Sequence, residues 1–249
     1  MNLSLPWITS LFFIVIRIGT VLLFTPIQAI RQLPIHARLL FIFIFSMLLV
    51  NYVPNSIPLT DTRILIGGVA EFSNGLILAT SLSAAFAVFQ IAGQLIDNEL
   101  GINSLAIFNP SEHSHEPLTS HLFSMLAILF FFGMSGHIWL FKGLAYSFTI
   151  SPPGSLTLFK GFLPVIKQLT FVFSFSFMIA SPIIVALLTV DLCGAVITRN
   201  MPQVSTYFLT LPIKIGLGLI LLIMMMHYFR PISDLVFERC FQTWQELLS

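Results

Sequence analysis

The chain has 249 residues, of which 57% are hydrophobic and only 8% are charged, and its formal net charge is +1. Soluble domains carry about 25% charged residues, so this composition excludes an ordinary water-soluble globular fold. The near-neutral charge gives no basic surface that would hold a phosphate backbone, so we expect no nucleic acid partner. We expect an all-α, polytopic helical membrane protein in contact with membrane lipid.

A helix that spans roughly 30 Å of hydrocarbon needs about 20 apolar residues. About six apolar segments approach or exceed this length, at residues 7–29, 37–53, 63–97, 117–150, 162–198 and 204–229. The second is short for a span, whereas the fourth is long and has possible bend points at Gly133, Gly136 and Gly143. An amphipathic tail at 231–249 is expected to follow, and the lack of repeats or linkers predicts a single domain over 1–249.

The cationic residues between these segments do not define one membrane orientation. Arg31 and Arg38 favour one placement of the first connection, whereas Arg63 and Lys160 favour the opposite one. Neither orientation satisfies the positive-inside rule. We therefore expect some apolar segments to be hairpins buried in a protein assembly rather than simple bilayer spans.

Four charged residues within the apolar segments need partners, because an unpaired charge in lipid costs on the order of 3 kcal/mol. Asp191 and Lys214 stand about equally far from Pro202, so a hairpin would place them at one depth. We predict a buried structural ion pair between them, and the alternative is a proton relay through Asp191. Arg17 and Glu71 form a second possible pair.

Small residues recur at every fourth position of the third segment, as Gly75, Ala79, Ser83 and Ala87. This spacing places them on one helix face, where another helix backbone can approach closely. Packing within the chain and an interface with another subunit are both open readings of this stripe.

A polar stretch after the third segment has the composition of a loop. Its notable residues are Ser104, Phe108, Asn109, Pro110, Glu112, His113, His115, Glu116 and Pro117. Alternating histidines can bind zinc, but no further convergent ligand is evident, so we expect neither a metal site nor a cofactor.

A catalytic alternative rests on the run Gly133-Met134-Ser135-Gly136, which has the form of the nucleophile motif of rhomboid intramembrane serine proteases. His227 on the sixth segment would be the base. His227 lies at the end of its segment, and no residues for an oxyanion hole accompany Ser135. We therefore expect no enzyme, and cleavage of a transmembrane substrate with and without Ser135→Ala separates the two interpretations.

Several motifs, in order along nearly the whole chain, resemble the FliR family of type III export proteins. In the N-terminal half the resemblance is carried by Arg17, Pro26, Pro34, Arg38, Gln90, Ala92, Gly93, Gly101 and Asn109-Pro110, the last standing where aspartate-proline is common. Further on it is carried by Gly136-His137, Ser147-Phe148, Pro152, Asp191, Pro202-Gln203, Pro212-Ile213-Lys214, Gly216 and Gly218, with Ser205 where asparagine is usual. The segment from Gly136 to Pro152 is more typical of flagellar members than of injectisome members.

The resemblance implies a structural and gating subunit of the flagellar type III export channel, located in the bacterial inner membrane at the flagellar basal body. It implies assembly with FliP-like and FliQ-like subunits and with FlhB-like and FlhA-like export components, and unfolded protein cargo in transit. Much of such an assembly lies above the bilayer plane, which would explain the conflicting orientation signals. In the family, the loop after the third segment helps to plug the closed channel, and it corresponds here to residues 104–117.

Overall fold

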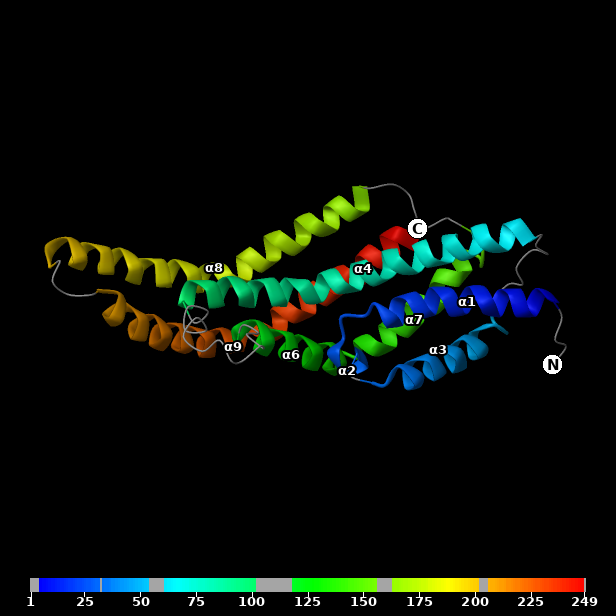
Figure 1. The fold of residues 1–249 in the computed structure, drawn as a ribbon, viewed down its shortest axis with the longest axis horizontal. Coiled ribbons are helices and arrows are strands. Elements are labelled where there is room, and N and C mark those ends of the chain that lie inside the picture. Colours follow the sequence, from blue (N-terminus) through cyan, green and yellow to red (C-terminus); the bar gives the residue numbers. More distant parts are fainter. Residues whose placement is uncertain are drawn as a thin grey trace. The chain divides into compact units, whose positions relative to one another are not determined.

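The computed structural model describes residues 5–31, 33–53, 61–101, 118–155, 163–201 and 206–248. Every regular element in these ranges is an α-helix (Figure 1). The helices are α1 (Leu5–Leu23), α2 (Gln28–Arg31), α3 (Ile35–Leu49), α4 (Asp61–Leu100), α6 (Leu118–Gly133), α7 (Gly136–Ile150), α8 (Leu163–Asn200) and α9 (Thr206–Leu248). The predicted all-α fold class is therefore confirmed.

Only some of the apolar segments are long enough to cross a membrane. Among the described residues, three helical stretches have the required length and composition: Ile64–Leu100, Ile166–Asn200 and Leu209–Glu246. By contrast, α1 has 19 residues and α3 has only 15. Helix α3 is shorter than a perpendicular span of about 20 residues. This agrees with the expectation that not every apolar segment is a simple bilayer span.

The fourth apolar segment is broken where its glycines predicted a bend. The axes of α6 and α7 differ by 70°, and Ser135 at the break has a left-handed backbone with φ of 60°. A Cβ atom on Gly136 would lie 2.6 Å from the ring of Phe131, so this position needs glycine. Gly143 is not a bend point. It allows the ring of Trp244 to pack against α7, where a Cβ atom would lie 2.7 Å from that ring.

The last apolar segment and the predicted amphipathic tail belong to one continuous helix. Helix α9 continues through Pro212 and Pro231 to Leu248. A proline inside a helix removes one hydrogen bond, and side-chain burial beyond Pro231 compensates for this loss. The buried positions recur at helical spacing, at Ser233, Val236, Phe237, Cys240 and Trp244.

The first of two compact units comprises Met1–Ala85, Phe131–Gln168 and Phe237–Ser249. Its apolar core joins Ile14, Ile18 and Leu22 of α1 to Ile42 of α3 and Phe148 of α7. These side chains are removed from both water and lipid. Many other side chains of α3 remain exposed on the chain by itself, including Leu40 and Leu48.

The second compact unit comprises Phe86–Phe130 and Leu169–Val236. Phe229 of α9 lies at its centre, with ring centroids 5.2 Å from Phe89 of α4 and 5.3 Å from Phe123 of α6. Ser176 of α8 donates a hydrogen bond to the carbonyl of Val88 at 3.0 Å. Aromatic packing and this buried hydrogen bond together hold α4, α6, α8 and α9 in one unit.

Candidate functional site

Asp97 connects the end of α4 to the beginning of α6. Its side chain is 0% exposed, and its two carboxylate oxygens accept hydrogen bonds from the backbone N–H groups of Thr119 and Ser120, each at 3.0 Å. These N–H groups belong to the first turn of α6, where no intrahelical acceptor is available. A carboxylate at a helix N-terminus is also favoured by the helix dipole. Asp97 therefore caps α6 and holds together the two ends of the segment 102–117.

The helix backbones approach very closely beside this carboxylate. A Cβ atom on Gly93 would lie 2.4 Å from the Cα of Ser120, a distance that real Cβ atoms do not adopt. The Ser120 hydroxyl donates to the carbonyl of Gln90 at 3.0 Å. Gln90, Gly93 and Asp97 lie three and four positions apart, so they present one face of α4 to α6. This contact gives a physical reason for the Gln90 and Gly93 motif noticed in the sequence.

Lys214 of α9 contacts both α8 and the end of α4. Its Nζ lies 2.5 Å from Oδ2 of Asp191 and donates to the backbone carbonyl of Glu99 at 3.1 Å. That carbonyl belongs to the last turn of α4, where carbonyls lack intrahelical donors and a cation is favoured. Lys214 therefore holds the helix end that leads into residues 102–117.

The Asp191–Lys214 pair that the sequence predicted is formed, but it is not fully buried. The side chain of Lys214 is 14% exposed and that of Asp191 is 44% exposed. In the described part of the chain, the Asp191 side of the pair is open to its surroundings. The expected energy of a completely buried pair therefore does not apply, and the value for a solvent-accessible pair is more appropriate.

Glycines complete the contacts at the end of α4. Gly101 ends this helix with φ of 72°, a left-handed conformation that favours glycine. A Cβ atom on Gly218 of α9 would lie 2.2 Å from Leu100 Cδ2, so α9 packs directly against the last turn of α4. We call the polar groups at this place the loop-base cluster. It consists of the side chains of Asp97, Asp191 and Lys214, the carbonyl of Glu99, and the N–H groups of Thr119 and Ser120.

Arg17 is at the centre of a second polar network, which lies in the first compact unit. Its side chain is 0% exposed, as is that of Glu71. Nε and Nη2 of Arg17 donate to the two oxygens of Glu71, at 2.6 and 2.8 Å. The remaining donors reach the carbonyls of Ser147 and Ser151, each at 3.0 Å. The possible Arg17–Glu71 pair is therefore present, in the bidentate geometry that Arg provides and Lys cannot.

The same network fixes the turn that follows α7. The N–H of Gly154 donates to Glu71 at 2.8 Å, and Asn74 donates to the carbonyl of Ser155 at 2.8 Å. The ring of Phe148 lies 4.2 Å from the Arg17 guanidinium. The Ser147-Phe148 and Pro152 motif thus surrounds a buried cation, and the network ties α1, α4 and α7 together.

The small-residue stripe lies partly inside the chain. Gly75 is in close contact with α1, because a Cβ atom there would lie 2.8 Å from Thr20 Cβ. Ala79 is also buried. Ser83 and Ala87 are only partly buried. Gly75 and Ala79 therefore pack within the first unit, whereas Ser83 and Ala87 keep part of their surface exposed on the described chain.

The other residues singled out in the sequence take different places. The predicted plug residues from Ser104 to Pro117, including His113 and His115, lie outside the described residues. In the ranges that are described, no group of three or more His, Cys, Asp or Glu side chains is placed to hold a metal ion. Ser135 precedes α7 at the helix break, and its carbonyl accepts from Ile138 N–H at 2.9 Å. His227 contacts the Tyr228 ring edge-on.

Long apolar helices, a broken helix pair and paired charges between helices define a polytopic α-helical membrane protein. The chain matches the model of the family "bacterial export proteins, family 1" over residues 8–240, and it belongs to this family. The flagellar biosynthetic protein FliR of Escherichia coli K12 is 26% identical, over 98% of this chain and 95% of the relative. The FliR protein of Bacillus subtilis is also 26% identical, over 100% and 98%.

A relative with a different name matches a shorter part of the chain. The surface presentation of antigens protein SpaR of Shigella flexneri is 26% identical over 58% of this chain and 56% of the relative. The names of these relatives refer to flagellar biosynthesis and to surface presentation of antigens, rather than to a catalysed reaction.

Proposed function

We propose that this chain is a structural and gating subunit of a flagellar type III protein-export channel in the bacterial inner membrane, at the flagellar basal body. The family match covers residues 8–240, and relatives named as flagellar biosynthetic proteins align over nearly the full length of both chains. The SpaR match is shorter, which favours the flagellar system over the injectisome. The apolar helices support a place in a membrane.

The gating part of the proposal assigns residues 104–117, which lie between α4 and α6, as a plug that closes the pore between export events. The observation that carries it is the loop-base cluster. Asp97 joins the two ends of this segment, and Lys214 holds the helix that enters it. Both ends of the proposed plug are thus held at one place, and the helices that carry it are tied to each other there.

The length of the segment is sufficient for this role. From the contour length of half the segment, the residues between Gly101 and Leu118 can reach at most roughly 25 Å from the loop-base cluster. This reach exceeds the diameter of a helix, about 10 Å. The loop can therefore obstruct an opening that admits an unfolded polypeptide, and it would do so by occupancy rather than by a chemical reaction.

The proposed partners are FliP-like and FliQ-like subunits, with FlhB-like and FlhA-like export components nearby and unfolded protein cargo in the pore. Support comes from the surface of α8, whose large apolar side chains are exposed on the isolated chain. They include Phe173, Phe177, Val185, Leu192 and Val196. A continuous apolar surface of this kind is covered by lipid or by neighbouring helices. Ser83 and Ala87 provide a place on α4 where a second helix can approach.

The gating proposal is tested by deleting Ser111 to Glu116 in the assembled channel. We expect the deletion to raise ion leakage through the closed channel without abolishing protein export, because a shorter plug no longer fills the opening. A matched control replaces the same residues with six glycines and serines, which keeps the length but changes the side chains. Occupancy predicts that this control still closes the pore. Unchanged conductance in the deletion variant, in a complex that assembles normally, would overturn the gating role.

The subunit role is tested separately by Ser83→Leu with Ala87→Leu. These changes should separate the helix backbones and reduce co-purification with FliP-like and FliQ-like subunits. Ala79→Leu is unsuitable for this purpose, because Ala79 is buried within the chain. Full co-purification of the double variant would place the interface elsewhere.

A further inference from the structure

The exposed surface of α4 changes in character along the helix. In its first half the exposed side chains are large and apolar, as at Leu65 and Leu76. Beyond Leu76, every exposed side chain of α4 is polar and uncharged: Thr80, Gln90 and Asn98. By contrast, α8 and α9 expose large apolar side chains along their length. The second half of α4 therefore differs from the other long helices in what it can contact.

Three carboxamide side chains form a line on this polar face, within the second compact unit. Gln90, Gln94 and Asn98 follow one another at every fourth position, so they lie on one side of the helix. Gln90 and Asn98 are exposed, and Gln94 is half-buried. The hydrogen bond that α6 makes with Gln90, from the Ser120 hydroxyl, goes to its backbone carbonyl and not to its side chain. We call these three side chains the amide ladder.

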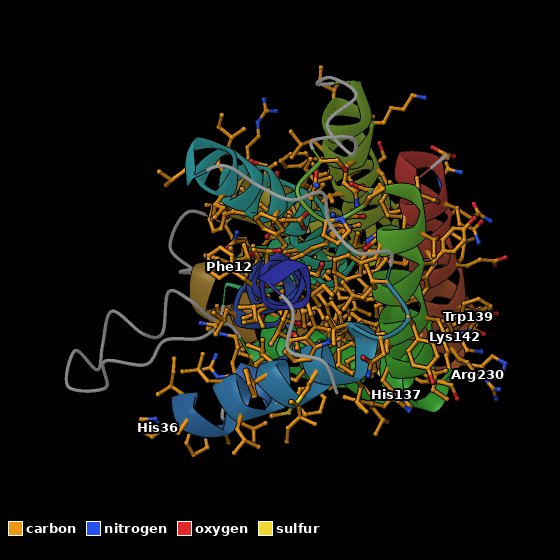
Figure 2. All side chains as sticks on the ribbon, turned by 90° about the vertical axis from the view of Figure 1, so that its right-hand side faces the viewer. Phe12, His36, His137, Trp139, Lys142 and Arg230 are labelled. Atoms are coloured by element: carbon orange, nitrogen blue, oxygen red, sulfur yellow. The ribbon has the colours of Figure 1, made fainter. Side chains whose placement is uncertain are left out.

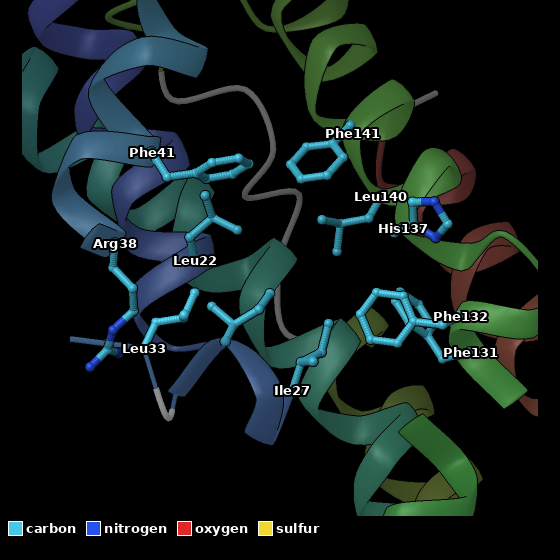
Figure 3. Close-up of a pocket in the computed structure, with 11 residues that line it drawn as sticks. Leu22, Ile27, Leu33, Arg38, Phe41, Phe131, Phe132, His137, Leu140 and Phe141 are labelled. Carbon is cyan, nitrogen blue, oxygen red and sulfur yellow. The ribbon is translucent and has the colours of Figure 1, made fainter. Parts of the chain in front are cut away.

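Two other accessible surfaces, both in the first compact unit, have a different chemistry. One is a cavity of about 240 Å³, whose accessible surface is apolar and is formed by side chains such as Leu22 and Phe41 (Figure 3). The other is the outer side of α7, where Nζ of Lys142 lies 5.9 Å from the centroid of the Trp139 ring (Figure 2). Neither surface offers a row of uncharged hydrogen-bonding groups.

The amide ladder is unsuited to hydrocarbon. A carboxamide that leaves water without a partner is costly, and polar side chains on membrane helices face the interior of a bundle or a water-filled space. The ladder also carries no charge, because Asp97 is buried against α6 and Glu99 lies about 100° around the helix from Asn98. A helix that crosses α4 at Ala87 leaves much of the ladder uncovered, since Gln94 lies about 10 Å further along the axis. The ladder therefore faces water or the polar groups of another molecule.

We propose that the amide ladder lines the export conduit and forms hydrogen bonds with the backbone of unfolded cargo polypeptide, an inference that rests on the proposed export function. A carboxamide has a C=O acceptor and an NH₂ donor, which are the groups that a peptide bond presents. An unfolded chain carries such groups at every residue, so the ladder would bind cargo of any sequence. Four residues of α-helix advance about 6 Å, and two residues of extended chain advance about 6.6 Å. Successive carboxamides can therefore reach every second residue of an extended polypeptide.

The end of the ladder lies at the base of the proposed plug. Asn98 directly follows Asp97, which caps α6, and α4 ends at Gly101. A polypeptide that passes the opened plug is then next to the carboxamides. The absence of charge suits passage, because neutral hydrogen bonds are weak enough to release cargo, whereas a charged lining would retain cargo of the opposite sign.

Photocrosslinking in the assembled export complex tests this contact directly. The probe is an export substrate fused at its C-terminus to a stably folded domain, which stalls in the channel. The photoreactive residue p-benzoylphenylalanine is placed at position 94. The control places it at position 65, because Leu65 is 75% exposed on the apolar half of the same helix. We expect crosslinks to the substrate from position 94 and none from position 65.

The other outcomes separate this inference from the export function itself. Crosslinks from position 94 to another subunit, unchanged by the substrate, would overturn the inference and assign this face to a subunit interface. Crosslinks to the substrate from position 111 but not from position 94 would also overturn it, while leaving the export function in place. A substrate that crosslinks to neither position would contradict both the ladder and the export function.

Two double variants test whether the carboxamides themselves matter. Gln90→Leu with Gln94→Leu removes both amides and keeps the backbone carbonyl that Ser120 contacts. The export rate should fall roughly fivefold in complexes assembled at the wild-type level, as expected for the loss of a neutral hydrogen bond. The fall should be equal for an acidic and a basic substrate, and Gln90→Asn with Gln94→Asn should export at nearly the wild-type rate. A wild-type rate in the leucine variant, or a loss confined to one substrate, would overturn recognition of the backbone.

Discussion

Asp97→Asn should loosen the base of the proposed plug while leaving the rest of the fold in place. The Asp97 carboxylate is completely buried and accepts two backbone N–H groups, each at 3.0 Å. An asparagine keeps one acceptor oxygen and turns an NH₂ group toward the other backbone donor. One charge-assisted hydrogen bond is lost, and the remaining one becomes neutral. Hydrogen bonds to charged groups contribute about 1.5–3 kcal/mol, so we expect a loss of about 2 kcal/mol at this contact.

A loss of about 2 kcal/mol raises the population of the opened α6 N-terminus roughly 30-fold, since 1.4 kcal/mol corresponds to a factor of ten. Hydrogen exchange of the Thr119 and Ser120 amides in the assembled complex measures this opening directly. Ion leakage through the closed channel should rise in parallel. Asp97→Ala should be more severe than Asp97→Asn, because it leaves both N–H groups without an acceptor.

Glu99→Gln is the matched control for Asp97→Asn. It neutralises a carboxylate two residues further along α4, but Lys214 contacts only the backbone carbonyl of Glu99. We expect exchange of the α6 amides to be unchanged in this variant. If Asp97→Asn and Glu99→Gln gave the same exchange rates as the wild type, Asp97 would not hold the base of the segment.

Three further perturbations separate the contributions of packing and charge. Gly93→Ala forces a Cβ atom against Ser120 and should lower the free energy of unfolding by about 1–3 kcal/mol, with a lower melting temperature of the complex. Gly133→Ala is the control, because its Cβ atom meets open space and the melting temperature should not change. Equal melting temperatures for the two variants would contradict the close-contact argument. Arg17→Lys keeps the buried charge but loses the bidentate hydrogen bonds to Glu71. The free energy of unfolding should therefore fall by about 2 kcal/mol. A variant as stable as the wild type would show that a guanidinium is not needed at this position. A double-mutant cycle of Asp191→Asn and Lys214→Met, which measures both the amount of assembled complex and export, should show a coupling energy of about 1 kcal/mol or less. Lys214→Met should be the more harmful single change. A double variant that assembles but does not export would instead support a proton relay.

The sequence predicted the apolar helices and the Asp191–Lys214 pair, and it offered Arg17–Glu71 as a possible second pair, for a common physical reason. A long apolar segment removed from water has no solvent to hydrogen-bond its backbone. Its N–H and C=O groups must therefore pair within the segment, which requires a helix. A charge inside such a run must find a partner, which is why Arg17 and Glu71 could be matched although 54 positions separate them. The composition of the apolar segments and the spacing of their charges are therefore enough to predict helices and paired charges before the packing is known.

Other features were beyond the reach of the sequence because their partners are backbone groups. Asp97 stands at the end of an apolar run beside a polar loop, where a carboxylate is ordinarily solvated. Its partners are the N–H groups of Thr119 and Ser120, and no side-chain pattern marks such donors. The only indication in the sequence was that an acidic residue, Asp97, stands about one helical turn before the polar stretch 104–117. The continuity of α9 through Pro231 also depends on packing, since the buried face of this helix continues on both sides of the proline and outweighs one lost hydrogen bond.

The two charged networks differ in a way that matches what each part of the molecule is proposed to do. Arg17 is completely buried and its donors are shared among Glu71, Ser147 and Ser151, so any displacement breaks several hydrogen bonds at once. Lys214 makes two contacts, and its carboxylate partner is 44% exposed, where the surroundings can replace the interaction. Rearrangement therefore costs less free energy at Lys214 than at the Arg17 network, whereas the completely buried Asp97 keeps the base of the proposed plug in place. A gate needs a fixed attachment for the segment that closes it and a nearby contact that can exchange.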